Sequence, residues 1–226
     1  MKFTSLEALK NPKIRQTLLT WMIFWFFAAG TSIYILAPHG ADQLNNFSVT
    51  SISFLVFSAF GAWYYRIDQR LPHQASLKIQ GVSIFLLTVL LVIIGLYIVK
   101  KFPLSEITQK EIMLSKFYFP LFRIETFITK TCDILFQQVF IYGILKKLKQ
   151  FQFSNKVTIE LFSICFFIIH LPLILSLKMY AFYFIVPSLF AGFIFSYFIL
   201  NYRFGLVLAF AVHFCFYLSI GIYLRL

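Results

Sequence analysis

Long apolar runs alternate with short polar links along the chain. An apolar run of roughly 20 residues is long enough to cross the ~30 Å hydrocarbon core of a bilayer as a helix. Lipid offers no partner for backbone N–H and C=O groups, so such a run predicts a helix with internally paired backbone. Seven runs have about this length: residues 17–37, 48–65, 79–99, 130–146, 159–177, 181–200 and 204–224.

Residues 100–129 differ from these runs, because charged side chains are interspersed with aromatic clusters such as Phe117-Tyr118-Phe119. This mixture is typical of a helix lying in the headgroup region, and Pro120 predicts a break in it. We therefore expect an all-α fold, a polytopic transmembrane helical bundle of about seven spans plus an interfacial helix. Residues 1–226 are expected to form a single membrane domain.

The composition excludes a water-soluble domain, since 60% of residues are hydrophobic and 12% are charged. Most of the formal net charge of +12 lies in links beside the apolar runs, where basic side chains contact anionic lipid. Membrane lipid is therefore an expected partner, and nucleic acid is not. Cys132, Cys165 and Cys215 lie in separate runs without C-x-x-C spacing, which predicts neither a disulfide framework nor a zinc site.

The distribution of basic residues predicts the orientation. The segment before the first run and the link at residues 146–156 carry four basic residues each, whereas the loop at residues 38–47 carries none. Because cytoplasmic loops are enriched in Lys and Arg, the N-terminus and residues 146–156 are expected in the cytoplasm, and residues 38–47 outside.

Three polar positions on three runs share one depth in this topology. At about 1.5 Å per residue, Gln138 lies about 12 Å from the cytoplasmic boundary, and His170 and His213 lie about 15 Å from it. A polar group at that depth is costly unless it faces another polar group or a water-filled cavity. We therefore expect Gln137 or Gln138 to point into one shared cavity with both histidines.

Three motifs on consecutive runs carry a family resemblance. They are Gln137-Gln138-Val139-Phe140-Ile141-Tyr142-Gly143, Phe166-Phe167-Ile168-Ile169-His170 and His213-Phe214-Cys215-Phe216-Tyr217. In order and interval they resemble the CAAX-protease and bacteriocin-processing (CPBP, or Abi) intramembrane endopeptidases. That family carries E-E-x-x-x-R-G, F-x-x-x-H and H-x-x-x-N on three helices. The resemblance covers about residues 130–224, and the earlier runs match only in being hydrophobic.

The resemblance implies that a glutamate and the first histidine activate water, while the second histidine and the asparagine stabilise the oxyanion. Here Gln137 and Gln138 stand at the glutamate positions, and a glutamine amide is too weak a base to deprotonate water. Tyr142 replaces the arginine, and Tyr217 replaces the asparagine. The sequence thus predicts an intramembrane endopeptidase homologue whose catalytic base is missing, in a bacterial cytoplasmic membrane.

Several alternatives stay open at this point. Asp133, one turn before Gln137, is a candidate substitute base, or it forms a local i, i+3 pair with Lys130. The two glutamines are equally explained as interhelical hydrogen-bond partners, and the histidines as neutral packing residues. Functionally, a protease would cleave a membrane-proximal peptide or protein in a cavity open to the cytoplasm. The alternative is a non-enzymatic membrane binding or immunity protein that retains the cavity, and a small transporter ranks third.

No cofactor is expected, and no metal either, because two histidines without a carboxylate at their depth supply too few ligands.

Overall fold

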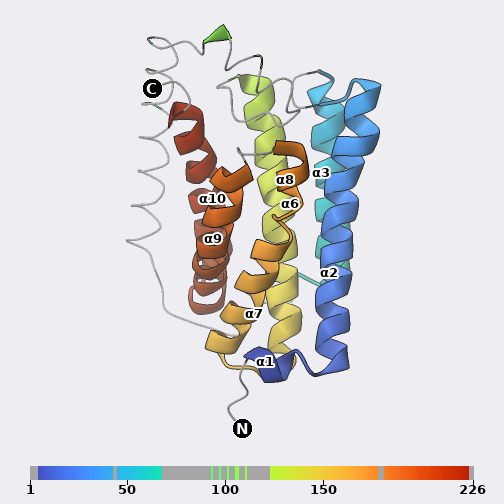
Figure 1. The fold of residues 1–226 in the computed structure, drawn as a ribbon, viewed down its shortest axis with the longest axis vertical. Coiled ribbons are helices and arrows are strands. Elements are labelled where there is room, and N and C mark those ends of the chain that lie inside the picture. The colour runs from blue at the N-terminus through green and yellow to red at the C-terminus, as the bar shows by residue number, and fades with distance from the viewer. Residues whose placement is uncertain are drawn as a thin grey trace.

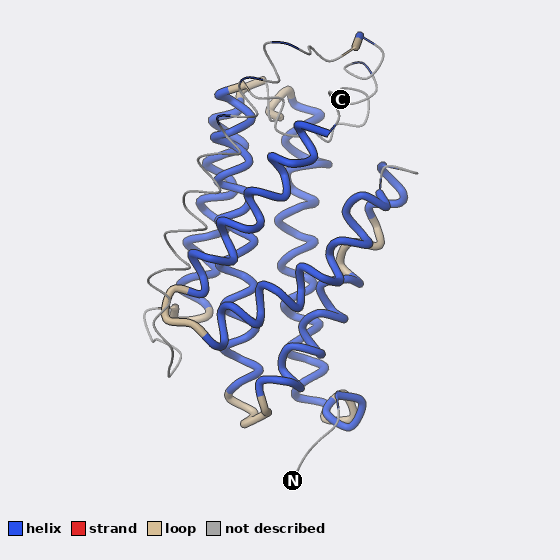
Figure 2. Tube along the Cα trace, turned by 90° about the vertical axis from the view of Figure 1, so that its left-hand side faces the viewer, coloured by secondary structure: helices blue, strands red, loops and turns tan. Residues whose placement is uncertain are grey.

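The computed structural model describes residues 5–42, 45–67, 123–177 and 181–223, together with six single positions between 93 and 110. Within these ranges all regular structure is helical (Figures 1 and 2). The all-α class is therefore confirmed for the described part of the chain. The expected span at 79–99 and most of the expected interfacial helix at 100–129 lie outside the described residues.

The described helices run up and down along one long axis (Figure 1). The elements in chain order are α1 (Ser5–Ala8), α2 (Pro12–Gly30) continued by η1 (Thr31–Leu36) and η2 (Ala37–His39), α3 (Phe47–Tyr64), α6 (Ile124–Lys149), α7 (Asn155–Ile168), α8 (Leu173–Leu177), α9 (Phe182–Asn201) and α10 (Gly205–Tyr223).

Four described helices are long and apolar enough to cross a membrane: Pro12–His39, Phe47–Tyr64, Asn155–Leu175 and Phe184–Asn201. The apolar helix Gly205–Ile220 is shorter. These helices are compatible with an integral membrane protein. Their ends follow local sequence: Asn11 and Ser154 accept backbone hydrogen bonds as N-caps of α2 and α7.

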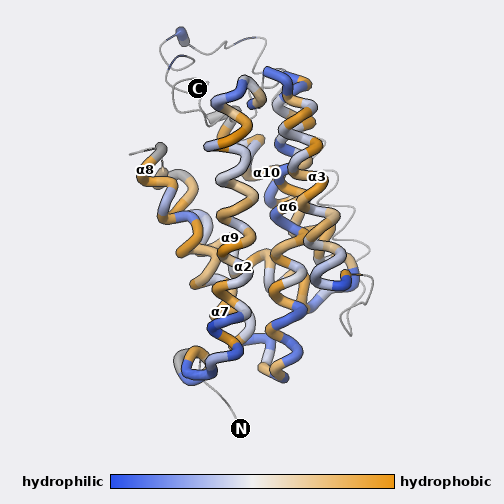
Figure 3. The backbone as a smooth tube through the Cα atoms, turned by 90° about the vertical axis from the view of Figure 1, so that its right-hand side faces the viewer, coloured by the Kyte–Doolittle hydropathy of each residue, from blue (hydrophilic) through white to orange (hydrophobic). Residues whose placement is uncertain are grey.

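Helix α6 lies at the centre of the described bundle and contacts α2, α3, α7, α9 and α10. It begins at Ile124, so the last residues of the expected interfacial segment belong to this helix instead. Hydrophilic positions, which gather at the ends of the bundle, also reach into it along α6 (Figure 3). Because neighbouring helices shield α6 from lipid, it can hold polar side chains that a peripheral helix could not.

Small residues allow close approach at two helix contacts. A Cβ atom on Gly192 would lie 2.8 Å from Ser163 Cα, so α9 and α7 meet almost backbone to backbone. This fits the small-residue packing typical of membrane helices. Gly143 of α6 likewise leaves no room for a side chain against the Tyr65 ring. Trp21 of α2 donates a hydrogen bond of 3.0 Å to the carbonyl oxygen of Phe140, which ties α2 to α6.

The predicted span at residues 159–177 is interrupted. Helix α7 ends at Ile168, a turn follows, and α8 starts at Leu173. Pro172 has no backbone N–H and disfavours the helical conformation of the residue before it, which explains the break. His170 therefore lies in a turn between two helices.

The links expected on the cytoplasmic side meet at one end of the bundle. Lys146 donates to the carbonyl oxygen of Arg66, and Asn155 donates to Asn201 over 3.0 Å. The loop that contains Asp42 follows α2, η1 and η2 in the chain and lies at the opposite end of the bundle (Figure 1).

Candidate functional site

A cavity of about 300 Å³ lies between α2 with η1, α6, and the turn leading into α8. Aromatic rings from several helices line much of it, including those of Trp25, Phe54, Phe136 and Phe184. The polar side chains that line it include Asp42, Lys130, Asp133, Gln137, His170 and Tyr217. Charged side chains at this depth are rare, so the cavity is the strongest candidate for a site.

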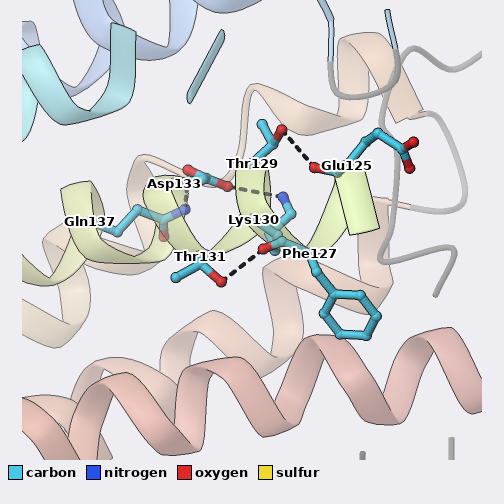
Figure 4. Close-up of polar contacts among 7 residues, drawn as sticks. All are labelled: Glu125, Phe127, Thr129, Lys130, Thr131, Asp133 and Gln137. Atoms are coloured by element: carbon cyan, nitrogen blue, oxygen red, sulfur yellow. Dashed lines mark hydrogen bonds and ion pairs between the residues drawn. The ribbon is translucent and has the colours of Figure 1, made fainter. Parts of the chain in front are cut away.

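Asp133 connects the polar side chains of α6 (Figure 4). Its Oδ2 accepts from Lys130 Nζ at 2.9 Å, and its Oδ1 accepts from Gln137 Nε2 at 2.9 Å. The spacings i, i+3 and i, i+4 place the three residues on one helix face. The Lys130–Asp133 pair expected from the sequence is thus present, and the Lys130 side chain is only 2% exposed. Good geometry and a second donor offset part of the cost of burying this pair.

Lys130 also reaches the neighbouring helix α10. Its Nζ lies 4.5 Å from the centroid of the Tyr217 ring. An ammonium over an aromatic face is attracted by the ring quadrupole, more strongly where water is excluded. Tyr217 therefore stabilises the charged lysine from a second helix.

Gln137 lines the cavity, and its side-chain oxygen has no hydrogen-bond partner among the described residues. A carboxylate only accepts hydrogen bonds, so the bond to Asp133 must come from the Gln137 amide nitrogen. This fixes the side-chain oxygen Oε1 on the other side, where it receives no hydrogen bond. The Tyr217 side chain lies close enough to interact with the same amide. Gln137 is only 8% exposed, and Oε1 of the more deeply buried Gln138 likewise has no hydrogen-bond partner in the described part of the chain.

His170 is held by its own backbone. Its Nδ1 lies 2.6 Å from the carbonyl oxygen of Phe166, and its ring packs edge to face on Phe166 at 4.6 Å. A carbonyl only accepts, so Nδ1 carries the proton and Nε2 is left as an acceptor. The turn created by Pro172 makes this geometry possible, because His170 has left the regular helix.

A second cavity of about 340 Å³ contains both histidines. His213 Nδ1 lies 3.3 Å from Gln138 Nε2, and the His213 ring packs on Phe195 with centroids 4.9 Å apart. Val186, Phe190 and Ile194 of α9 line this cavity and are also exposed on the outer surface. The second cavity therefore opens sideways, toward the hydrocarbon of a surrounding bilayer.

The two histidines and two glutamines do not converge on one cavity. Gln137 and His170 line the first cavity, and His213 lines the second, while His170 and Tyr217 line both. Gln138 lines neither cavity, and its Nε2 lies 3.3 Å from His213 Nδ1. Adjacent helical residues point about 100° apart, so Gln137 and Gln138 face different neighbours.

The first cavity extends toward one end of the bundle. The first cavity is lined by Tyr34, Ala37 and Asp42, which lie at the end opposite Lys146. The basic residues predict that this end lies outside, and the sequence also predicts a cavity open to the cytoplasm. The two expectations exclude each other, because Asp42 and Lys146 lie at opposite ends of the bundle.

Tyr142, at the arginine position of the first motif, lines neither cavity. It packs against the main hydrophobic core instead. Five residues along a helix turn the side chain by about 140° away from Gln137, which places it on another face.

The sequence did not predict that Asp42 or Trp25 belongs to the site. Asp42 lies in a loop and Trp25 in the first apolar run, and no local pattern indicates that either packs against α6. Lys130 was considered only as a local partner of Asp133. Its position inside an apolar run was the available signal.

Comparisons with protein families, with curated proteins and with solved structures find no match for this chain. The likeness to CPBP endopeptidases therefore stays a prediction from three motifs.

Proposed function

We propose that this chain is a CPBP-type intramembrane protein that lacks peptidase activity and binds a ligand in the cavity between α2, α6 and α8. The observation that carries the proposal is the state of Asp133. It is the carboxylate next to Gln137, and both its oxygens already accept hydrogen bonds, from Lys130 and Gln137.

Peptide hydrolysis needs a group that takes a proton from water as it attacks. The glutamines at the motif positions cannot do so, because an amide oxygen has negligible basicity. Both oxygens of Asp133 already accept hydrogen bonds of 2.9 Å, one from Lys130 and one from Gln137, so this carboxylate is engaged rather than directed at a water molecule. Among the described residues, the carboxylate nearest the motif glutamines is thus engaged, and a cavity with donors, acceptors and aromatic walls supports binding rather than hydrolysis.

One observation favours an active peptidase as the second candidate. His170 and Asp133 line the same cavity, and the hydrogen bond from Nδ1 to Phe166 leaves Nε2 of His170 as an acceptor. In that case His170 would take the proton from water, and Asp133 would support it electrostatically.

Purified native protein in lipid nanodiscs, incubated with a fluorogenic peptide library of membrane-proximal segments, distinguishes the two candidates. Binding without hydrolysis predicts no cleavage above that of empty nanodiscs. Gln137→Glu supplies a carboxylate at the motif position. A general base typically accelerates a hydrolysis step by about 10²–10⁴-fold. If the native chain cleaves peptide, and Asp133→Asn and His170→Gln each lose this activity while keeping the fold, the protein is a peptidase and the binding proposal is wrong.

The biological setting belongs to the same proposal. A bacterial cytoplasmic membrane with a cytoplasmic N-terminus follows from the basic links and the family resemblance. Self-immunity against a bacteriocin is a role that a binding protein of this type could fulfil, with a membrane-proximal peptide or protein as its partner. Cysteine labelling from both sides of the membrane tests the orientation.

A further inference from the structure

The two histidines that line the second cavity differ in hydrogen-bonding character. Nδ1 of His170 donates to the carbonyl oxygen of Phe166, which leaves Nε2 of His170 as an acceptor. Nδ1 of His213 lies 3.3 Å from the amide nitrogen of Gln138. An amide nitrogen only donates, so this Nδ1 accepts and Nε2 of His213 carries the proton. The pair of rings therefore offers one acceptor and one donor.

Nε2 of each histidine is accessible to a ligand. In the part of the chain that the structure describes, the nitrogen of each ring that is engaged by protein is Nδ1. The fully enclosed side-chain atoms that lack a partner in the same ranges are Oε1 of Gln137 and Oε1 of Gln138. Neither Nε2 is among them, so both keep accessible surface. The two histidines line the second cavity together and lie close enough to interact electrostatically.

Aromatic rings hold the His213 side chain in a fixed orientation. Its centroid lies 4.9 Å from that of Phe195 and 5.3 Å from that of Tyr217, with interplanar angles of 33° and 24°. These nearly parallel rings pack against the faces of the imidazole, and Gln138 lies at its Nδ1 edge. The remaining edge, which contains Nε2, is the part of the ring that lines the cavity.

The other walls of this cavity are mostly apolar and lead toward the bilayer. Val186, Phe190 and Ile194 line it and are also exposed on the outer surface of α9. The hydroxyl of Ser188 on the same wall donates to the carbonyl oxygen of Ile185 over 2.7 Å. At about 30 Å³ for each water-sized group, the volume of about 340 Å³ holds roughly ten methylene groups. The cavity therefore suits one apolar chain that enters from the hydrocarbon.

We infer that the second cavity binds a single apolar chain ending in a hydroxyl group, which donates to Nε2 of His170 and accepts from Nε2 of His213. A hydroxyl both donates and accepts, as this pair of rings requires. Hydrocarbon offers a hydroxyl no partner, so the histidines supply the bonds that the surrounding lipid lacks. The bond to His170 does not depend on the Gln138 amide, because a backbone carbonyl orients that ring.

This site is distinct from the first cavity, to which the proposed function refers. The hydroxyl belongs either to a free long-chain alcohol or to the glycerol headgroup of a lipid with one acyl chain. The volume of the cavity argues against a lipid with two chains inside it.

The first test is photocrosslinking of the full chain in phosphatidylcholine nanodiscs with decan-1-ol that carries a diazirine in the middle of its chain. Mass spectrometry should find saturable labelling of α9 and α10 peptides. Unlabelled decan-1-ol, 1-methoxydecane and decane serve as competitors, compared by their mole fraction in the lipid. The ether accepts but does not donate, so it and decane should compete about 10- to 100-fold more weakly than the alcohol. Equal competition by alcohol and ether, or no saturable labelling of these helices, overturns the inference.

The second test removes the histidine nitrogens. His170→Phe and His213→Phe keep an aromatic ring, and each should lower the affinity for the alcohol about 10-fold or more while leaving that for the ether nearly unchanged. His39→Phe is the matched control, because His39 also bonds through Nδ1 to the carbonyl oxygen four residues earlier but lines neither cavity. Equal effects of His170→Phe and His39→Phe contradict the inference. If the variants do not fold, the competition series on the native chain decides.

A third variant tests the location of the chain. Pro187, Ala191 and Ile194 line the cavity from one face of α9. Ala191→Leu adds volume to this face and should reduce labelling by the alcohol probe severalfold. Unchanged labelling in Ala191→Leu, in a variant that unfolds like the native chain, overturns the assignment to this cavity.

The two sources of the hydroxyl are separated by a further competitor. Monodecanoylglycerol carries a chain of the same length on a glycerol headgroup. If it competes more strongly than decan-1-ol, the ligand is a single-chain lipid, and if it competes more weakly, the ligand is a free alcohol. Failure of both to compete overturns the inference.

Discussion

The two cavities share a wall of His170, Phe184 and Tyr217 but hold their polar groups in different ways. In the first, the polar contacts run along a single helix, from Lys130 through Asp133 to Gln137. In the second, Gln138 of α6 contacts His213 of α10. The hydrogen bonds of the first cavity orient groups on one helix, which the Lys130 contact with the Tyr217 ring links to α10, whereas the contact of Gln138 with His213 itself joins two helices.

This difference explains why the first cavity is the better candidate for a ligand site. Its helix network satisfies Asp133 and Lys130 and leaves a directed acceptor on Gln137. The second cavity opens past exposed apolar side chains of α9 and has few polar groups at its wall.

The largest effect is expected from breaking the charged pair of the first cavity. Asp133→Leu leaves Lys130 buried without its counter-ion, which should destabilise the fold by about 3–5 kcal/mol. Replacing both residues, as in Lys130→Met with Asp133→Leu, should restore most of the loss, because an apolar pair carries no desolvation cost. Unfolding in mixed SDS micelles measures both variants. A single variant that unfolds at the same SDS fraction as the native chain contradicts the network described for this cavity.

A smaller loss is expected at the helix contact beside the second cavity. Gly192→Ala places a Cβ atom 2.8 Å from Ser163 Cα, and separating α7 from α9 should cost about 1–3 kcal/mol. Gly30→Ala is the matched control, since its Cβ would meet nothing nearer than Tyr34 Cδ2 at 3.9 Å. The same unfolding assay applies. If both substitutions had equal effects, close packing of α7 and α9 would not be what shapes this region.

A loss of about 1 kcal/mol is expected from Gln138→Leu, which removes the contact between α6 and His213. Thr131→Ala is the control on the same helix, because Thr131 is exposed and its hydroxyl bonds only to the carbonyl oxygen of Phe127. That variant should stay within about 0.5 kcal/mol of the native chain. An equal loss in the two variants would mean that Gln138 does not join α6 to α10.

The last prediction concerns the access of a water-soluble reagent to the first cavity. It does not depend on any change in the stability of the fold. Ser32→Cys lines the first cavity and should react with a charged, membrane-impermeant maleimide from the same side as Asn45→Cys. Lys149→Cys should react from the other side only. Leu19→Cys, on the exposed apolar part of α2, should stay unlabelled because it faces lipid. Labelling of Ser32→Cys from the side of Lys149→Cys would reverse the described opening of the cavity.

Much of the helical framework was predictable because hydropathy is a local property of the chain. The runs at 17–37, 48–65 and 181–200 correspond closely to described helices. The Lys130–Asp133 pair was predictable too, since residues three apart on a helix are neighbours whatever surrounds them. The break at His170 was missed, although Pro172 was a visible signal for it.

The sequence by itself determined an apolar helical chain, because length, periodicity and composition act residue by residue. Only the tertiary structure decided that Gln137 lines the first cavity while Gln138 contacts His213, and that Tyr142 packs in the core. It also brought Asp42 and Trp25 to the same cavity as Asp133. A helix fixes the angle between its own side chains, but the neighbour that each one meets depends on how the other helices pack around it.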